Sequence, residues 1–130
     1  MRFKDFSTNN LFEAISNIPM KNQGGTCYQD AMNYMMAKSK NGNTSILLCH
    51  GLVTGQGPIA GIVYGHAWVE KGSTVIDKTV PITLPKQLYY ALGNIKESDV
   101  YRYTYDEMSH KVTEFGTYGP WEQKLLNNKY

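Results

Sequence analysis

The chain has 130 residues, a length typical of one domain that buries its own hydrophobic core, so we expect a single domain over residues 1–130. Apolar residues make up 42% of the chain and charged residues 18%, which excludes a disordered tail. The formal net charge is only +2 and no run of basic residues stands out. The composition therefore gives no reason to expect nucleic-acid or membrane binding.

The chain contains two cysteines, Cys27 and Cys49. Its first residues lack the apolar stretch of a secretory signal, and no window approaches the roughly 18 apolar residues of a membrane span. We therefore expect a cytoplasmic protein in which both thiols are free.

The first predicted element is a short helix over residues 11–15. A longer helix is predicted over residues 27–39, because Thr26 and Gln29 have the spacing of a capping box. A β-prone run over residues 45–54 then predicts a strand. The apolar residues of the longer helix have the spacing of a buried helix face: Tyr28, Ala31, Met32, Met35 and Met36.

A β-hairpin is predicted next, with strands over 62–70 and 73–77 and with Lys71-Gly72 as its two-residue turn. With this turn His66 stands directly opposite Asp77, and their Cβ atoms lie about 4.5–5.5 Å apart on one face. A slip of one residue would move Asp77 to the other face, so the pairing depends on the turn. The remaining predicted elements are a helix over 84–92, a strand over 100–103 and a helix over 105–115, which begins at a capping box of Thr104 and Glu107.

Cys27 is the candidate nucleophile. It follows Gly24-Gly25-Thr26 and opens the predicted helix, where about half a positive charge from the helix dipole favours a thiolate. Unpaired backbone N–H groups at the same helix end can hold an oxyanion, and the glycines let a substrate approach the backbone closely. The alternative is an inert cysteine that is buried in the core.

His66 and Asp77 are the candidate base and its orienting carboxylate. A carboxylate at Asp77 can accept the imidazole N–H of His66, fix its tautomer and stabilise the imidazolium. Taken singly, each residue also fits a structural role, as a partly buried strand histidine or a strand-end aspartate. Their alignment across the hairpin, in a chain that also has Cys27, favours a Cys-His-Asp nucleophilic site.

Two segments resemble the motifs of transglutaminase-like domains: His66-Ala67-Trp68-Val69-Glu70 followed by Val75-Ile76-Asp77-Lys78-Thr79, and Gly25-Thr26-Cys27 before an Ala/Met-rich helix. The order Cys, His, Asp also matches, and Gly24-Gly25-Thr26-Cys27 is similar to the Gly-Gly-x-Cys of arylamine N-acetyltransferases. The resemblance covers about residues 24–80. It implies a papain/transglutaminase-like α+β fold, with a nucleophile helix packed on an antiparallel sheet, and a catalytic triad of Cys27, His66 and Asp77.

Three further residues are candidates for the same site. Gln23 precedes Cys27 by four residues and resembles the upstream glutamine of papain-like enzymes, which implies an oxyanion donor; ordinary loop polarity is the alternative. Trp68 shares a strand face with His66 and, with Gly25, is a candidate for substrate binding; a core tryptophan is the alternative. Glu70 and Thr79 are expected to be structural, and we assign no role to three other residues: Cys49, His50 and His110.

Cys27, His66 and Asp77 are also acceptable zinc ligands. The sequence, however, has neither a Cys-x-x-Cys nor a His-x-x-x-His cluster, and no fourth ligand stands out. We therefore expect neither a metal nor another cofactor.

These residues together predict a cysteine-dependent acyl-transfer enzyme that acts on an amide or thioester, with a protein or peptide as substrate. The enzyme is expected to be a protease, amidase, deamidase or transglutaminase. These alternatives stay open because the sequence does not determine whether water or an amine completes the reaction. The alternative is a catalytically inactive papain-like binding module, or an intracellular effector that binds a protein partner.

Overall fold

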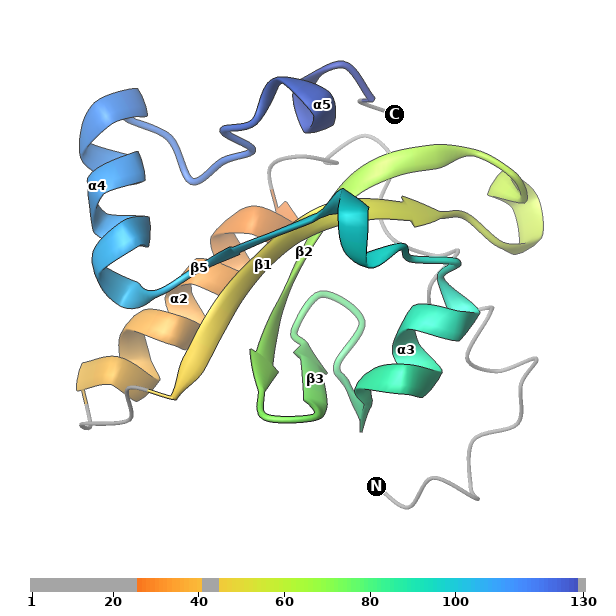
Figure 1. The fold of residues 1–130 in the computed structure, drawn as a ribbon, viewed down its shortest axis with the longest axis horizontal. Coiled ribbons are helices and arrows are strands. Elements are labelled where there is room, and N and C mark those ends of the chain that lie inside the picture. The colour runs from red at the N-terminus through yellow and green to blue at the C-terminus, as the bar shows by residue number, and fades with distance from the viewer. Residues whose placement is uncertain (1–25, 41–44, 129–130) are drawn as a thin grey trace.

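The computed structural model describes residues 26–40 and 45–128. The described strands form one antiparallel sheet: β1 (Ile46–Thr54), β2 (Val63–Lys71), β3 (Thr74–Asp77), β4 (Ile82–Pro85) and β5 (Val100–Tyr103). Their order across the sheet is β4-β3-β2-β1-β5 (Figure 1). The two long strands β1 and β2 pair with each other, β5 pairs with β1, and β3 and β4 follow on the other side of β2. This arrangement confirms the predicted α+β class and the antiparallel sheet.

The helices are α2 (Thr26–Lys40), α3 (Lys86–Leu92), α4 (Tyr105–Phe115) and α5 (Gln123–Leu126), with short 3₁₀ turns at Gly57–Ile59 and Glu97–Asp99. Helix α2 confirms the helix predicted over residues 27–39, and α4 has the predicted bounds. The α4 capping box is present: Thr104 Oγ1 accepts from the Glu107 N–H at 3.2 Å, and Glu107 Oε1 accepts from the Thr104 N–H at 2.9 Å. The predicted helix over 11–15 and the Thr26 side chain lie outside the described residues.

The helix predicted over residues 84–92 is wrong at its start. Residues Ile82–Pro85 form strand β4, and α3 begins only at Lys86. Ile82 and Leu84 are buried whereas Thr83 is exposed, which is the two-residue period of a strand. Pro85 explains the boundary, because a proline disfavours helical backbone at the residue before it.

The first of two buried clusters lies between the sheet and the helices α2 and α4. Strand side chains alternate between faces, so Leu48 of β1 and Val69 of β2 point toward α2. Four of the five residues of the predicted helix face are buried in this cluster: Tyr28, Ala31, Met32 and Met35. The prediction is wrong for Met36, whose side chain is 43% exposed.

The second cluster lies on the opposite face of the sheet, beneath α3. Cys49 of β1 and Trp68 of β2 are cross-strand partners on this face, and Tyr89 of α3 packs against them. His66 has the same strand parity as Trp68, so it belongs to this face. The two cysteines are both free and buried, and they lie in different clusters.

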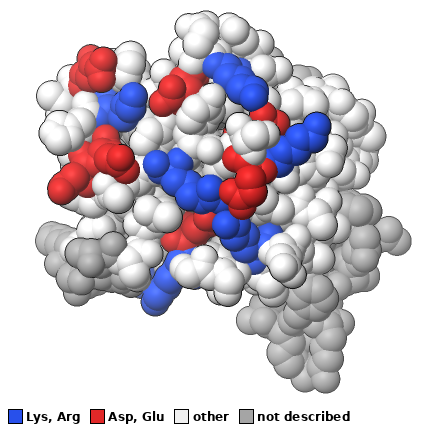
Figure 2. Space-filling view, in the orientation of Figure 1, with Lys and Arg blue, Asp and Glu red and all other residues white. Residues whose placement is uncertain are grey.

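The charged surface in Figure 2 shows acidic and basic side chains next to one another, without a patch of one sign on this face. The interleaving agrees with the small net charge of +2. In the part of the chain that the structure describes, no helix has the length and apolar character needed to cross a membrane.

Candidate active site

Cys27 lies at the start of α2, as its second residue. The first turn of a helix has unpaired N–H groups and a partial positive charge, so the local backbone suits an anionic sulfur or an oxyanion. The side chain is only 3% exposed and packs in the cluster beneath α2. A substrate can therefore reach the sulfur only if neighbouring groups move.

The hairpin turn lies one residue later than predicted. The ladder between β2 and β3 pairs Lys71 with Thr74, so the two turn residues are Gly72 and Ser73. Gly72 has φ 60°, and a glycine in this conformation at the first turn position is typical of a type II′ hairpin. The prediction placed glycine at the second position, which is the requirement of a type I′ turn.

This change shifts the strand register by two residues, so the prediction that His66 stands directly opposite Asp77 is wrong. Continuing the observed register places Asp77 opposite Trp68, diagonally from His66. A shift of two residues leaves every side chain on its face, whereas a shift of one would not. His66 and Asp77 therefore still meet: His66 Nε2 and Asp77 Oδ2 are 2.8 Å apart, and both side chains are 1% exposed.

The Asp77 carboxylate is held by two further donors. The Tyr89 hydroxyl donates to Oδ2 at 2.6 Å, the same oxygen that binds His66. The backbone N–H of Thr79 donates to the other oxygen, Oδ1, at 3.0 Å. Each carboxylate oxygen is thus engaged, which fixes the plane of the group relative to the imidazole.

The environment of this pair favours an imidazolium and a carboxylate. Burial alone would lower the pKa of His66, but the charges of Asp77 and Cys27, together with the hydrogen bond to Asp77, raise that pKa to about 10. Burial would raise the pKa of Asp77, but the His66 charge and hydrogen bonds from His66, Tyr89 and Thr79 lower it instead. Both groups are therefore charged near neutral pH.

Cys27 influences the pKa of the same imidazole ring. Because Nε2 of His66 faces Asp77, Nδ1 is the ring nitrogen left for a thiol. This Nδ1 is buried and has no hydrogen-bond partner in the described part of the chain. The charge of Cys27 nevertheless raises the pKa of His66, so the two side chains are electrostatically coupled. The structure thus joins His66 to Asp77 by a hydrogen bond and couples Cys27 to this pair through its charge.

The remaining predicted site residues have different outcomes. Trp68 is fully buried, so it packs against the site and does not line an open cleft. Its ring centroid lies 6.2 Å from that of His66 and 5.5 Å from that of Tyr89. Gln23 and Gly25 lie outside the described residues.

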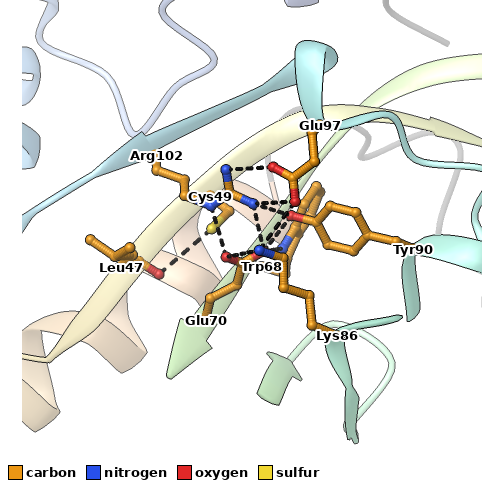
Figure 3. Close-up of polar contacts among 8 residues, drawn as sticks. All are labelled: Leu47, Cys49, Trp68, Glu70, Lys86, Tyr90, Glu97 and Arg102. Atoms are coloured by element: carbon orange, nitrogen blue, oxygen red, sulfur yellow. Dashed lines mark hydrogen bonds and ion pairs between the residues drawn. The ribbon is translucent and has the colours of Figure 1, made fainter. Parts of the chain in front are cut away.

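A second buried carboxylate, Glu70, lies on the same face of the sheet (Figure 3). Arg102 Nε donates to Glu70 Oε1 at 2.8 Å, and the Trp68 indole N–H donates to Oε2 at 3.1 Å. The Tyr90 hydroxyl donates to the same Oε2. Burial would raise the pKa of Glu70, but the bonds from Arg102, Tyr90 and Trp68 lower it. Arg102, Tyr90 and Trp68 thus hold the Glu70 carboxylate in place on this face of the sheet.

His50 is the other fully buried histidine, on the α2 face of the sheet. Its ring packs against those of Tyr28, Tyr103 and Trp121, at centroid distances of 4.6, 5.2 and 4.8 Å. Neither ring nitrogen has a hydrogen-bond partner among the described residues. Burial, helped by the nearby charge of His66, lowers the pKa of His50 to about 3, so this ring is neutral.

The described surface includes hollows, and two of them are large enough to hold a ligand. One of about 640 Å³ is lined by residues that include Lys86, Tyr90 and Glu97, and one of about 720 Å³ lies between Met36 and Tyr105. Neither is lined by a residue of the Cys27 site. Among the described residues, no group of three or more Cys, His, Asp or Glu side chains is placed to hold a metal ion.

No protein-family model, no curated protein and no solved structure matches the chain.

Proposed function

We propose that the chain is a cysteine-dependent acyl-transfer enzyme of the papain/transglutaminase-like class, with Cys27, His66 and Asp77 as its triad. One observation carries the proposal. His66 is joined to Asp77 through Nε2 at 2.8 Å, while Cys27, at the start of α2, raises the pKa of the same ring through its charge. A triad for nucleophilic acyl transfer has three groups: a nucleophile, a base that is coupled to it, and a carboxylate that orients the base.

In the proposed reaction Cys27 attacks the carbonyl carbon of an amide or thioester in a protein or peptide. His66 holds the proton of the thiol on Nδ1, as the imidazolium partner of the Cys27 thiolate, and then donates this proton to the leaving amine or thiol. Asp77 keeps Nε2 protonated and so leaves Nδ1 facing the sulfur. The backbone N–H of Cys27, with Gln23 as the second donor, stabilises the oxyanion, and water or an amine then releases the acyl group.

The low exposure of Cys27 favours a second candidate, a binding module with this fold that no longer turns over substrate. At 3% exposure the sulfur is less accessible than a working nucleophile must be during catalysis. The two candidates differ in whether the chemistry of Cys27 depends on His66.

The test is the pH dependence of Cys27 alkylation by iodoacetamide, read by mass spectrometry of the labelled peptide. If the triad works, labelling of Cys27 persists at pH values where an unassisted thiol, with a pKa of about 8.5, is protonated. His66→Ala should move the curve to higher pH, because the stabilising imidazolium is gone. Asp77→Ala should move it in the same direction by less.

Burial slows alkylation in every variant, so the position of the curve is compared, not the rate. His110→Ala is the matched control, because His110 lies exposed on α4, away from the proposed site. If wild type and His66→Ala give the same curve, Cys27 and His66 are not coupled, and the binding module becomes the better assignment.

A further inference from the structure

Two consecutive tyrosines of α3 each donate a hydrogen bond to a buried carboxylate. Tyr89 donates to Oδ2 of Asp77, and Tyr90 donates to Oε2 of Glu70. Both tyrosines are themselves buried, and their rings lie in one cluster with Trp68. Only the first pair touches the proposed triad.

We propose that Tyr89 is a positioning residue of the triad, which holds Asp77 in the orientation that binds the His66 imidazolium. The inference rests on the proposed function. Oδ2 of Asp77 accepts from both Tyr89 and His66, while Thr79 fixes Oδ1. The hydroxyl therefore restricts rotation of the carboxylate about its own axis and supplies a donor that water cannot supply in a buried site.

Loss of the Tyr89 hydroxyl acts on His66 through Asp77. A buried carboxylate with one donor fewer is easier to protonate, and it is also freer to rotate away from Nε2. Either change weakens the charge that stabilises the imidazolium. The His66 pKa then falls, and the thiolate of Cys27 loses part of its counter-charge.

Tyr90 provides an unusually close control. It is the next residue on the same helix, it is buried, and it also gives its hydroxyl proton to a buried carboxylate. Glu70 has Arg102 and Trp68 as further donors and makes no contact with the triad residues. Tyr90→Phe therefore removes the same atom and a hydrogen bond to a buried carboxylate, together with the bond that the hydroxyl accepts from Arg102 Nη2 at 2.8 Å, but it leaves Asp77 untouched.

The experiment compares the pH curve of Cys27 alkylation in wild type, Tyr89→Phe and Tyr90→Phe. Tyr89→Phe should move the curve to higher pH by at most about one unit, a tenfold change, because one hydrogen bond to a charged group is lost and its effect reaches Cys27 only through Asp77 and His66. Tyr90→Phe should leave the curve in place. Circular dichroism verifies that each variant is folded before it is labelled.

A double-mutant comparison separates positioning from a general loosening of the fold. In an Asp77→Asn background, Tyr89→Phe should produce no further shift, because its effect passes through the carboxylate. A further shift of the same size would overturn the proposal. So would a curve that moves to lower pH, since Tyr89 would then only compete with His66 for Oδ2.

Proton NMR of the His66 Nε2–H signal gives a readout that does not depend on Cys27. This signal should be protected from exchange in wild type and Tyr90→Phe, and should shift or broaden in Tyr89→Phe. An unchanged signal in Tyr89→Phe refutes the positioning role but leaves the triad standing. If instead wild-type labelling is independent of His66, the proposed function fails, whatever Tyr89 does to the signal.

Discussion

His50 should make the protein less stable as the pH falls. Its neutral ring is enclosed by three aromatic rings and finds no hydrogen-bond partner in the described residues. The folded protein therefore binds a proton at His50 only near pH 3, whereas the unfolded chain binds it near the ordinary value of 6.5. Between these two values the unfolded state holds one more proton than the folded state, so acid favours unfolding.

The size of the effect follows from the two pKa values. One excess proton in the unfolded state lowers the free energy of unfolding by about 1.4 kcal/mol for each pH unit. At pH 4.5, two units below the onset at 6.5, the loss is about 3 kcal/mol relative to neutral pH. This is a large fraction of the roughly 5–15 kcal/mol that stabilise an ordinary domain.

The assay is urea unfolding followed by far-UV circular dichroism at pH 7.5 and pH 4.5, for wild type and His50→Phe. Wild type should lose about 3 kcal/mol more than the variant between these pH values, because the variant has no proton to gain. Carboxylates such as Asp77 titrate in both proteins, so their contribution cancels in the comparison.

The absolute stability of His50→Phe does not test the protonation of His50, because the larger phenylalanine ring has little free space around it. A Cβ placed on Gly119 would lie 2.6 Å from Cε1 of His50, so little space remains. Overpacking of this kind costs about 1–3 kcal/mol, but it does so at both pH values. His110→Gln, at an exposed position of α4, should keep the wild-type pH dependence. If wild type and His50→Phe lose equal stability toward pH 4.5, the folded state protonates His50 and the reasoning is refuted.

Three further substitutions test the fold by chemical denaturation. Thr104→Ala removes half of the α4 capping box and should cost about 1 kcal/mol; no loss would mean that the bonds to Glu107 add nothing in solution. Met35→Ala empties a fully buried position beneath the sheet and should cost about 2–5 kcal/mol, whereas a loss below about 1 kcal/mol would contradict its burial. Gly55→Ala places a Cβ 2.4 Å from the carbonyl oxygen of Ile59 and should cost about 1–3 kcal/mol, an expectation that wild-type stability would contradict.

The elements predicted with correct bounds are those with local signals. Helix α4 is defined by two hydrogen bonds within four residues at its start and by Gly116, with φ 68°, after its end. Such signals do not depend on the rest of the fold, so the sequence suffices to place them. Strand β4 was missed because Leu84 was assigned to the following helix, although Pro85 marks the boundary.

The hairpin register depends on which residue takes the first position of the turn. Lys71-Gly72 as a type I′ turn would put Lys71 at a positive φ, whereas Gly72-Ser73 as a type II′ turn puts the glycine there. The turn chemistry therefore favours the observed register, which a prediction from loop length alone does not find. Because the two registers differ by an even number of residues, the meeting of His66 and Asp77 did not depend on this choice.

The contacts that surround the proposed triad could not be predicted from local patterns. Tyr89 is twelve residues from Asp77, and Arg102 is thirty-two residues from Glu70. Both contacts depend on how α3 and β5 pack on the sheet. No spacing in the sequence distinguishes Tyr89 from its neighbour Tyr90, although only Tyr89 reaches Asp77.

The two buried histidines show why residue type alone does not define a site. His50 and His66 are on neighbouring strands, both are removed from water, and burial lowers the pKa of each. His50 is surrounded by aromatic rings and remains neutral, whereas His66 meets the carboxylate of Asp77 and becomes an imidazolium. The charge on one ring in turn opposes a charge on the other. The catalytic proposal thus depends less on finding a histidine than on the carboxylate that the hairpin and α3 place beside it.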